Sequence, residues 1–171
     1  VEESKRAVAN LKAIIGDPKV LKAVADDFVT HYENRVAEGA TVEGKAMIVC
    51  MDREIAYHLY DDIIELRPDW AVEKLADDID DLPEEEKIKL KPIEKIRLVI
   101  TRDKDDEKRM YSMAGSKEYR KELDRQFKLE KSNFKIAIVV DMWSTGFDVP
   151  ALDTMYIDKP MRGHNLMQAI A

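Results

Sequence analysis

The chain has 171 residues, of which 45% are hydrophobic and 37% are charged, and its formal net charge is −7. This length supports one ordinary globular core and is most simply a single domain. No apolar run approaches the roughly 20 residues that a membrane span needs, and the charged N-terminus is not followed by a signal-peptide core. We therefore expect a soluble, cytoplasmic protein with no membrane partner.

The negative charge is unevenly distributed along the chain. Nucleic-acid-binding domains usually carry a basic surface, so the overall charge argues at first against that class. However, seven acidic groups fall within residues 77–86, and the remainder of the chain is about neutral. Closely spaced like charges repel one another and resist burial, so this stretch is predicted to be a solvated loop. The overall charge therefore does not exclude a DNA-facing surface elsewhere.

Two helices are predicted before the first strand. Residues 4–15 have a short amphipathic pattern, and we interpret residues 1–16 as a linker helix from a preceding domain. The Asp17-Pro18 pair has the residue types favoured at the N-cap and at the first position of a helix, and apolar side chains then recur at helical spacing. The main domain is therefore placed at residues 17–171.

The next segment predicts a buried strand followed by a capped helix. Residues 46–51 are a continuous apolar run that contains the single cysteine, Cys50. We interpret Cys50 as a small buried hydrophobe rather than a reactive thiol. Asp52 is the expected N-cap of a helix that ends before Pro68. Residues 70–79 are expected to add one or two further helical turns.

The second half of the chain continues the alternation of strands and helices. Strands are predicted at residues 96–101, 136–140 and 155–157, and helices at residues 117–129 and from residue 165 onward. Strands that are unbroken apolar runs separated by helices indicate a parallel sheet covered on both faces. The predicted fold class is therefore α/β, a three-layer sandwich with a mainly parallel sheet.

In such sheets, ligands bind beyond the carboxyl ends of the strands. The candidate functional loops are accordingly residues 51–53, 101–103, 144–149 and 158–164.

The third of these loops contains the tetrapeptide Thr-Gly-Phe-Asp at residues 145–148. Gly146 allows a sharp turn and close approach to a ligand, and the hydroxyl of Thr145 can bond a phosphate. Asp148 can accept from a hydroxyl or orient a cation. On these four residues alone, an ordinary turn with a local Asx-type bond is the favoured interpretation.

The end of the fourth loop, residues 162–164, precedes a helix whose first turns carry Asn165 and Gln168. Unpaired amides at a helix N-terminus attract anions, and the glycine at position 163 allows close approach, so this loop would suit a phosphate. The alternative is a surface loop with a solvated arginine and a capping asparagine.

The amino-acid sequence of the C-terminal region gives more specific evidence than these chemical arguments. The strand at 136–140 leads into DMWSTGFDVP at residues 141–150, and MRGHNLMQAIA occupies residues 161–171. These segments resemble the motor subunit of type I restriction-modification enzymes, specifically its second RecA-like lobe, which belongs to helicase superfamily 2. Residues 45–56 resemble the fourth motif of the same lobe. The resemblance implies a RecA-like form of the predicted sandwich.

The resemblance also implies roles for individual residues. Three are expected to face the DNA backbone: Arg53, Thr101 and Thr145. Three are expected to face the nucleotide: Gly146, Asp148 and Gln168. For Arg53, a surface ion pair at i,i+4 spacing fits the charge pattern equally well. Trp70 is expected to pack at a helix start, whereas packing and functional positioning are weighted equally for Trp143.

Motors of this class hydrolyse ATP between two RecA-like lobes, and the opening and closing of the cleft moves the protein along duplex DNA. ATP and Mg²⁺ would be held mainly by the first lobe, because neither its Gly-Lys-Thr loop nor its acidic magnesium motif occurs in these residues. The other implied partners are the nuclease domain of the same chain and the methyltransferase and specificity subunits of the complex.

We expect a fragment of the restriction subunit that is inactive by itself. The sequence ends within the sixth helicase motif, before the arginines that contact the γ-phosphate in this family. No catalytic centre is expected, and no metal site, because none of the three histidines has a partner at metal-ligand spacing. Two other functions remain open: a lobe of a stand-alone superfamily 2 DNA or RNA helicase, and a non-enzymatic α/β interaction domain.

Overall fold

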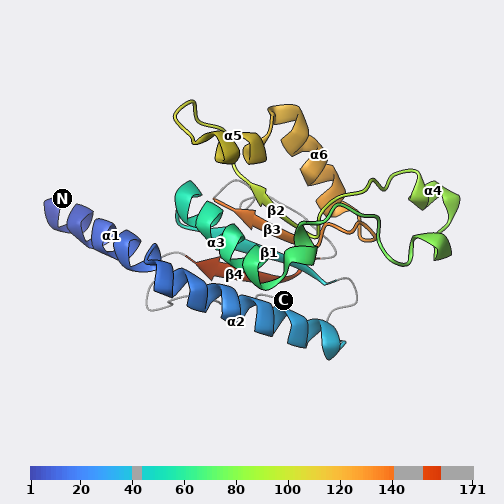
Figure 1. Cartoon of the computed structure of the whole chain (residues 1–171), viewed down its shortest axis with the longest axis horizontal. Helices are drawn as coiled ribbons and strands as arrows, with labels where there is room; N and C mark the ends of the chain where they lie inside the picture. Colours follow the sequence, from blue (N-terminus) through green and yellow to red (C-terminus); the bar gives the residue numbers. More distant parts are fainter. Residues whose placement is uncertain (40–43, 141–151, 159–171) are drawn as a thin grey trace.

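The central feature of the computed structural model is a four-stranded sheet (Figure 1). The structure describes residues 1–39, 44–140 and, as backbone only, 152–158. The strands are β1 (Lys45–Cys50), β2 (Ile96–Val99), β3 (Ile136–Val139) and β4 (Leu152–Asp158). Their order across the sheet is β2-β3-β1-β4, and each neighbouring pair is parallel. The predicted parallel sheet is therefore confirmed.

The first three helices are α1 (Glu2–Ile15), α2 (Pro18–Ala37) and α3 (Arg53–Leu66). Two of them, α2 and α3, begin at the residues that the capping signals indicated, whereas α1 begins at Glu2, two residues before the predicted start, and has no side-chain cap. The carboxylate of Asp17 accepts a hydrogen bond from the main-chain nitrogen of Lys19 at 2.9 Å, and that of Asp52 accepts from Ile55 at 2.8 Å. Each cap thereby satisfies a backbone donor that has no partner within its helix. Among the described residues, no helix has both the length and the apolarity to cross a membrane.

The segment between α3 and β2 differs from the prediction. It contains two 3₁₀ turns, η1 (Pro68–Ala71) and η2 (Ile79–Asp81), and the short helix α4 (Glu84–Lys87). Pro68 suits the first position of a helical turn, so the turn starts there, and most of the expected helix at 70–79 is irregular. All seven acidic residues of 77–86 are exposed, which confirms the predicted solvated segment.

The last two helices of the described residues are α5 (Lys108–Ala114) and α6 (Lys117–Lys128), and the helix predicted from residue 165 lies outside them. Helix α6 was predicted, but α5 was not. Only two side chains of α5 are buried, Met110 and Ala114, and two positions are too few to produce a recognisable helical period.

The sheet lies between two layers of helices (Figure 1). On β1, Ile48 and Cys50 belong to an apolar cluster with the buried faces of α2 and α3. Met47 and Val49 belong to the opposite cluster, which includes Phe127 of α6. Because side chains alternate between the two faces of a strand, α2 and α3 cover one face and α6 covers the other. The three-layer α/β sandwich of RecA-like type is confirmed.

Two predictions about single side chains are also confirmed. Cys50 is fully buried. Trp70 is buried and packs edge-on against Tyr32, with ring centroids 5.7 Å apart, so it serves packing rather than base stacking. His58 of α3 is exposed. Trp143 lies outside the described residues.

Gly115 forms the corner between α5 and α6 and has a φ of +69°. A Cβ atom at this position would lie 2.2 Å from Cδ1 of Tyr119. We expect Gly115→Ala to lower the free energy of unfolding by more than the roughly 1–2 kcal/mol that positive φ alone costs a residue with a side chain. Urea denaturation of the variant would measure this loss.

Gly39 provides a matched control, because its φ is +67° and a Cβ there would meet nothing within 4 Å. Gly39→Ala should therefore show only the conformational part of the loss. Equal losses at both positions would contradict the steric role of Tyr119.

Candidate functional site

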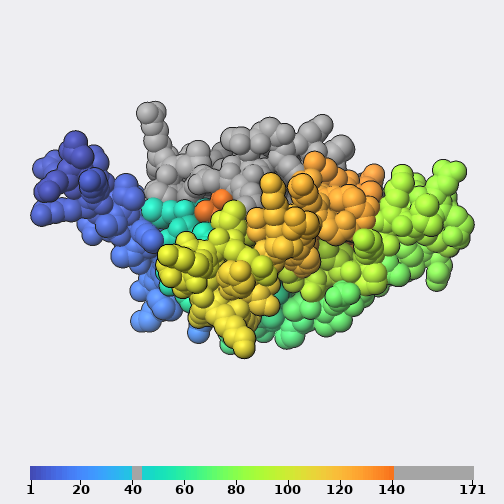
Figure 2. Space-filling model, turned by 90° about the horizontal axis from the view of Figure 1, so that it is seen from above, coloured from blue at the N-terminus to red at the C-terminus, as the bar shows by residue number. Residues whose placement is uncertain are grey.

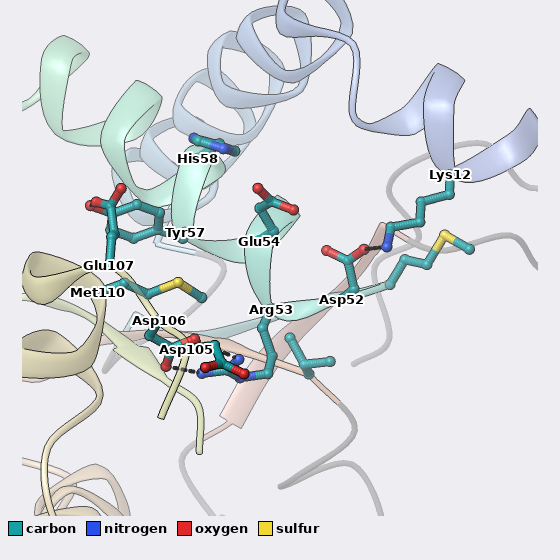
Figure 3. Close-up of a pocket in the computed structure, with 12 residues that line it drawn as sticks. Lys12, Asp52, Arg53, Glu54, Tyr57, His58, Asp105, Asp106, Glu107 and Met110 are labelled. Atoms are coloured by element: carbon teal, nitrogen blue, oxygen red, sulfur yellow. Dashed lines mark hydrogen bonds and ion pairs between the residues drawn. The ribbon is translucent and has the colours of Figure 1, made fainter. Parts of the chain in front are cut away.

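The carboxyl ends of β1, β2 and β3 meet at one edge of the sheet. Val49 of β1 aligns with Val139 of β3, and Val139 aligns with Val99 of β2. A pocket of about 510 Å³ lies at this edge (Figure 3). Its lining comes from α1, the start of α3, the segment before α5 and the end of β3: Lys12, Met51, Asp52, Arg53, Glu54, Tyr57, His58, Asp105, Asp106, Glu107, Met110 and Val140. The predicted loop at 51–53 therefore lies directly on the pocket.

Arg53, the first residue of α3, connects this loop to the one that follows β2. Its Nε and Nη2 donate to the main-chain oxygen of Thr101 at 3.0 and 2.6 Å. Nη1 donates to Oδ1 of Asp106 at 2.9 Å, and Nη2 donates to the second carboxylate oxygen. The hydrogen bonds between them raise the pKa of Arg53 and lower the pKa of Asp106. The guanidinium therefore binds both ends of the loop at residues 101–106, the main chain at Thr101 and the carboxylate of Asp106, and holds this loop in place.

Two residues predicted to bind DNA are thereby brought together. Arg53 and Thr101 are 48 positions apart in the sequence but are in direct contact. The charged partner of Arg53 is Asp106, 53 positions away, so the i,i+4 interpretation is wrong. Thr101 is exposed in the loop after β2, which ends at Val99 rather than at residue 101. Contact of either residue with DNA stays a prediction.

Asp52 links the pocket to α1 (Figure 3). Its Oδ1 caps α3, and its Oδ2 forms a 2.7 Å ion pair with Nζ of Lys12. The hydrogen bond to Asp52 raises the pKa of Lys12. One carboxylate therefore fixes both the start of α3 and the last turn of α1.

The sequence analysis missed a second polar cluster beside the pocket. The hydroxyl of Tyr57 donates to Glu107 and accepts from Nη1 of Arg109 at 2.9 Å. Arg109 also donates to both oxygens of Asp61 at 2.7 and 2.9 Å, and these hydrogen bonds raise its pKa. Burial raises the pKa of Tyr57. In the sequence, the only indication of this cluster was the i,i+4 spacing of Tyr57 and Asp61, which places them on one face of α3. The cluster holds α5 against that face through Arg109.

The pocket wall carries more carboxylates than cations. Five acidic and two basic side chains line it: Asp52, Glu54, Asp105, Asp106 and Glu107, with Lys12 and Arg53. Both cations are already in ion pairs with carboxylates. In the described part of the pocket lining, every lysine or arginine that a phosphate could approach therefore already has a carboxylate partner. Within the described ranges, no group of three or more His, Cys, Asp or Glu side chains is arranged to hold a metal ion.

The remaining predicted site residues lie outside the described residues: Thr145, Gly146, Asp148 and Gln168. The first three follow β3, and Val140, the last described residue before them, lines the pocket. The roles assigned to these four residues stay predictions.

Comparison with known proteins gives a consistent family assignment. Residues 42–171 match the family model T1R_D3-like, described as type I restriction enzyme subunit R domain 3. The type I restriction enzyme HindI endonuclease subunit of Haemophilus influenzae is 38% identical over 170 residues. The putative type I restriction enzyme MjaIXP endonuclease subunit of Methanocaldococcus jannaschii is 33% identical over 171 residues.

Each of these two alignments covers 99% of the chain but only 14% of the relative, so the chain spans about a seventh of the length of the curated relatives it matches. A further M. jannaschii relative, the putative MjaVIIP endonuclease subunit, is 60% identical over 43 residues, which cover 25% of the chain and 4% of that protein. Because the family model matches most of the sequence, the chain belongs to the type I restriction enzyme subunit R family, and its residues 42–171 correspond to domain 3 of that subunit.

Proposed function

We propose that this domain acts as the second RecA-like lobe of an ATP-driven motor that translocates duplex DNA, in a subunit whose translocation leads to the cleavage of foreign DNA. The observation that carries the proposal is the contact between the loops after β1 and β2, where Arg53 adjoins Thr101. The family resemblance assigns both loops, together with Thr145, to the DNA backbone. Membership of the subunit R family favours this role over a stand-alone helicase or a non-enzymatic interaction domain.

In this proposal the lobe supplies one half of a composite ATP site. Gly146, Asp148 and Gln168 would face the nucleotide, and the first RecA-like lobe would hold most of the ATP and Mg²⁺. A glycine lets the backbone approach phosphates, and a carboxylate can accept from a hydroxyl or orient a cation. Closure of the two lobes would complete the site, and its reopening would advance the DNA.

The proposal also implies a larger cytoplasmic assembly. Its partners would be duplex DNA, the first RecA-like lobe and the nuclease domain of the same chain, and separate methyltransferase and specificity subunits. The names of the relatives, which describe endonuclease subunits of type I restriction enzymes, support a multi-subunit complex of this kind.

The domain by itself is expected to show no ATP hydrolysis, with or without duplex DNA, because half of the composite site is missing. Phosphate release from the isolated domain would be compared with a no-protein control and with the complete subunit. Turnover reproducibly above the no-protein control would show that this domain does not depend on a second lobe.

The experiment that tests DNA contact is Thr145→Val in the complete subunit. Loss of the hydroxyl should weaken binding to unrelated duplexes similarly, because phosphate contacts position DNA without distinguishing its bases. The expected loss is on the order of 1 kcal/mol for a neutral hydrogen bond and up to roughly 3 kcal/mol for one to a charged phosphate. Titrations of labelled duplexes and of an ATP analogue would measure both affinities, and ATP affinity without DNA should hardly change.

Thr30→Val is a matched control, since Thr30 is exposed on α2, away from the carboxyl edge of the sheet. This variant should bind DNA as the unaltered subunit does. Unchanged DNA affinity in Thr145→Val, or a loss confined to ATP, would remove Thr145 from the DNA face.

A further inference from the structure

Helix α1 carries an apolar face that is largely uncovered. At about 3.6 residues per turn, four apolar side chains of the second half of the helix fall on one side: Val8, Leu11, Ile14 and Ile15. Ile15 is 7% exposed, but Val8 is 52%, Leu11 40% and Ile14 60% exposed. Figure 2 shows the first turns of α1 extending beyond the rest of the molecule. Only the last residue of this face is therefore buried against the domain.

The position of α1 is nevertheless defined by its last turn. Lys12 forms its 2.7 Å ion pair with Asp52, at the start of α3. The backbone of Gly16 lies close to α3, because a Cβ on Gly16 would be 3.6 Å from Cγ1 of Ile55. The helix is therefore anchored at one end, while most of its apolar face has no packing partner in the described part of the chain.

An uncovered face of this kind is costly for a helix of 14 residues. Isolated helices of about 12–15 residues are marginal in water, and most of the stability of protein helices comes from packing of the amphipathic face. With only Ile15 buried, the earlier turns of α1 gain little from tertiary packing. The face therefore requires a cover in the functional protein.

We infer that the apolar face of α1 packs against an earlier domain of the same subunit, one that precedes α1 in the polypeptide. The match to domain 3 begins at residue 42, so α1 lies before it, yet the alignments with both long relatives cover 99% of the chain and hence include α1. The chain spans only 14% of these relatives, and a third domain implies earlier domains in the same polypeptide.

The small size of the face favours this intramolecular occupant over a second copy of the chain. A stable interface between separate molecules usually buries about 1,200–2,000 Å², far more than three exposed side chains can supply. A covalently connected domain meets the helix at a high effective concentration, so a small apolar contact suffices. The inference rests on family membership and not on the proposed motor activity.

Cysteine accessibility in the complete subunit tests this packing. Leu11→Cys and Ile14→Cys would be labelled separately with a maleimide and quantified by peptide mass spectrometry. Ile88→Cys is the exposed control, because Ile88 is 78% exposed, and native Cys50 is the buried reference. Labelling at positions 11 and 14 should be at least about tenfold slower than at position 88, as burial under a stable contact requires.

A photo-crosslinking amino acid at position 11 identifies the occupant, and Val8→Cys replaces either cysteine variant that does not fold. Crosslinks to peptides that precede α1 in the same polypeptide are the expected result. Labelling as fast as at position 88 would overturn the inference. Crosslinks to residues 18–171, to a second copy of the subunit or to another subunit would also overturn it.

Discussion

Replacement of Asp148 by alanine in the complete subunit is expected to abolish DNA-dependent ATP hydrolysis and to leave the melting temperature nearly unchanged. Catalysis of phosphoryl transfer depends almost entirely on positioning and electrostatic stabilisation, so loss of a carboxylate that orients the nucleotide should be severe. A decrease of at least about 100-fold in turnover corresponds to roughly 2.7 kcal/mol in activation free energy. Phosphate release at saturating duplex DNA and a thermal melt would measure the two effects.

Asp80→Ala is the matched control, because Asp80 is an exposed aspartate in the acidic segment at η2. It should retain both hydrolysis and melting temperature. A loss of stability in Asp148→Ala beyond the roughly 0.5 kcal/mol typical of surface changes would make Asp148 structural. Full retention of hydrolysis would remove Asp148 from the nucleotide site.

The fold was predictable because its signals are local. Asp17 and Asp52 mark helix starts through hydrogen bonds that span two and three residues. All six residues of β1 are buried and five of them are apolar, as expected for a strand covered on both faces. Helix α5 was missed because it is short and its burial depends on neighbours that are distant in sequence.

The candidate site was predictable in its location but not in its contacts. Parallel strands bring their following loops to one edge, which placed Arg53 near Thr101 in advance. The pairing of Arg53 with Asp106 and of Tyr57 with Glu107 joins positions 53 and 50 residues apart, and no local pattern specifies it. The hydrogen bonds of Arg53 therefore show that it holds the loop after β2, which its position in the sequence alone did not indicate.

Arg53→Ala is expected to lower the free energy of unfolding of the domain by roughly 2–3 kcal/mol. Removing one partner of a fully buried ion pair costs about 3–5 kcal/mol, because the other charge is left without compensation. The side chain of Asp106 is 6% exposed and that of Arg53 is 28% exposed, so the loss should be somewhat smaller. Urea denaturation of the wild type and the variant at neutral pH would measure it.

Arg67 offers a control with the same chemistry in a more exposed place. It donates two hydrogen bonds to Glu33 at 2.6 and 3.0 Å, but the two side chains are 37% and 41% exposed. Arg67→Ala should therefore cost no more than about 1 kcal/mol. Equal losses in Arg53→Ala and Arg67→Ala would contradict the importance of burial for the Arg53 pair.

The lowered pKa of Asp106 adds a pH dependence to the Arg53 prediction. A carboxyl group with a lower pKa in the folded state stabilises the fold above its unfolded pKa of about 3.9, and this contribution is lost as the pH falls through its folded value. Since Arg53→Ala removes the main cause of the shift, the stability difference between wild type and variant should shrink below about pH 3.9. A difference that stays constant well below pH 3.9 would show that the ion pair is not its source.

Asp106→Asn in the complete subunit separates two roles of Arg53 in DNA binding. If Arg53 contacts phosphate directly, this change removes a negative charge and loosens the competing partner, so DNA affinity should rise. If the hydrogen bonds of Arg53 serve mainly to hold the loop that carries Thr101, DNA affinity should instead fall on the order of tenfold, or about 1.4 kcal/mol. In that case the slope of log affinity against log salt should remain unchanged, whereas loss of a phosphate contact would reduce it by about one. A rise in affinity in Asp106→Asn would support the predicted direct contact of Arg53 with the DNA backbone.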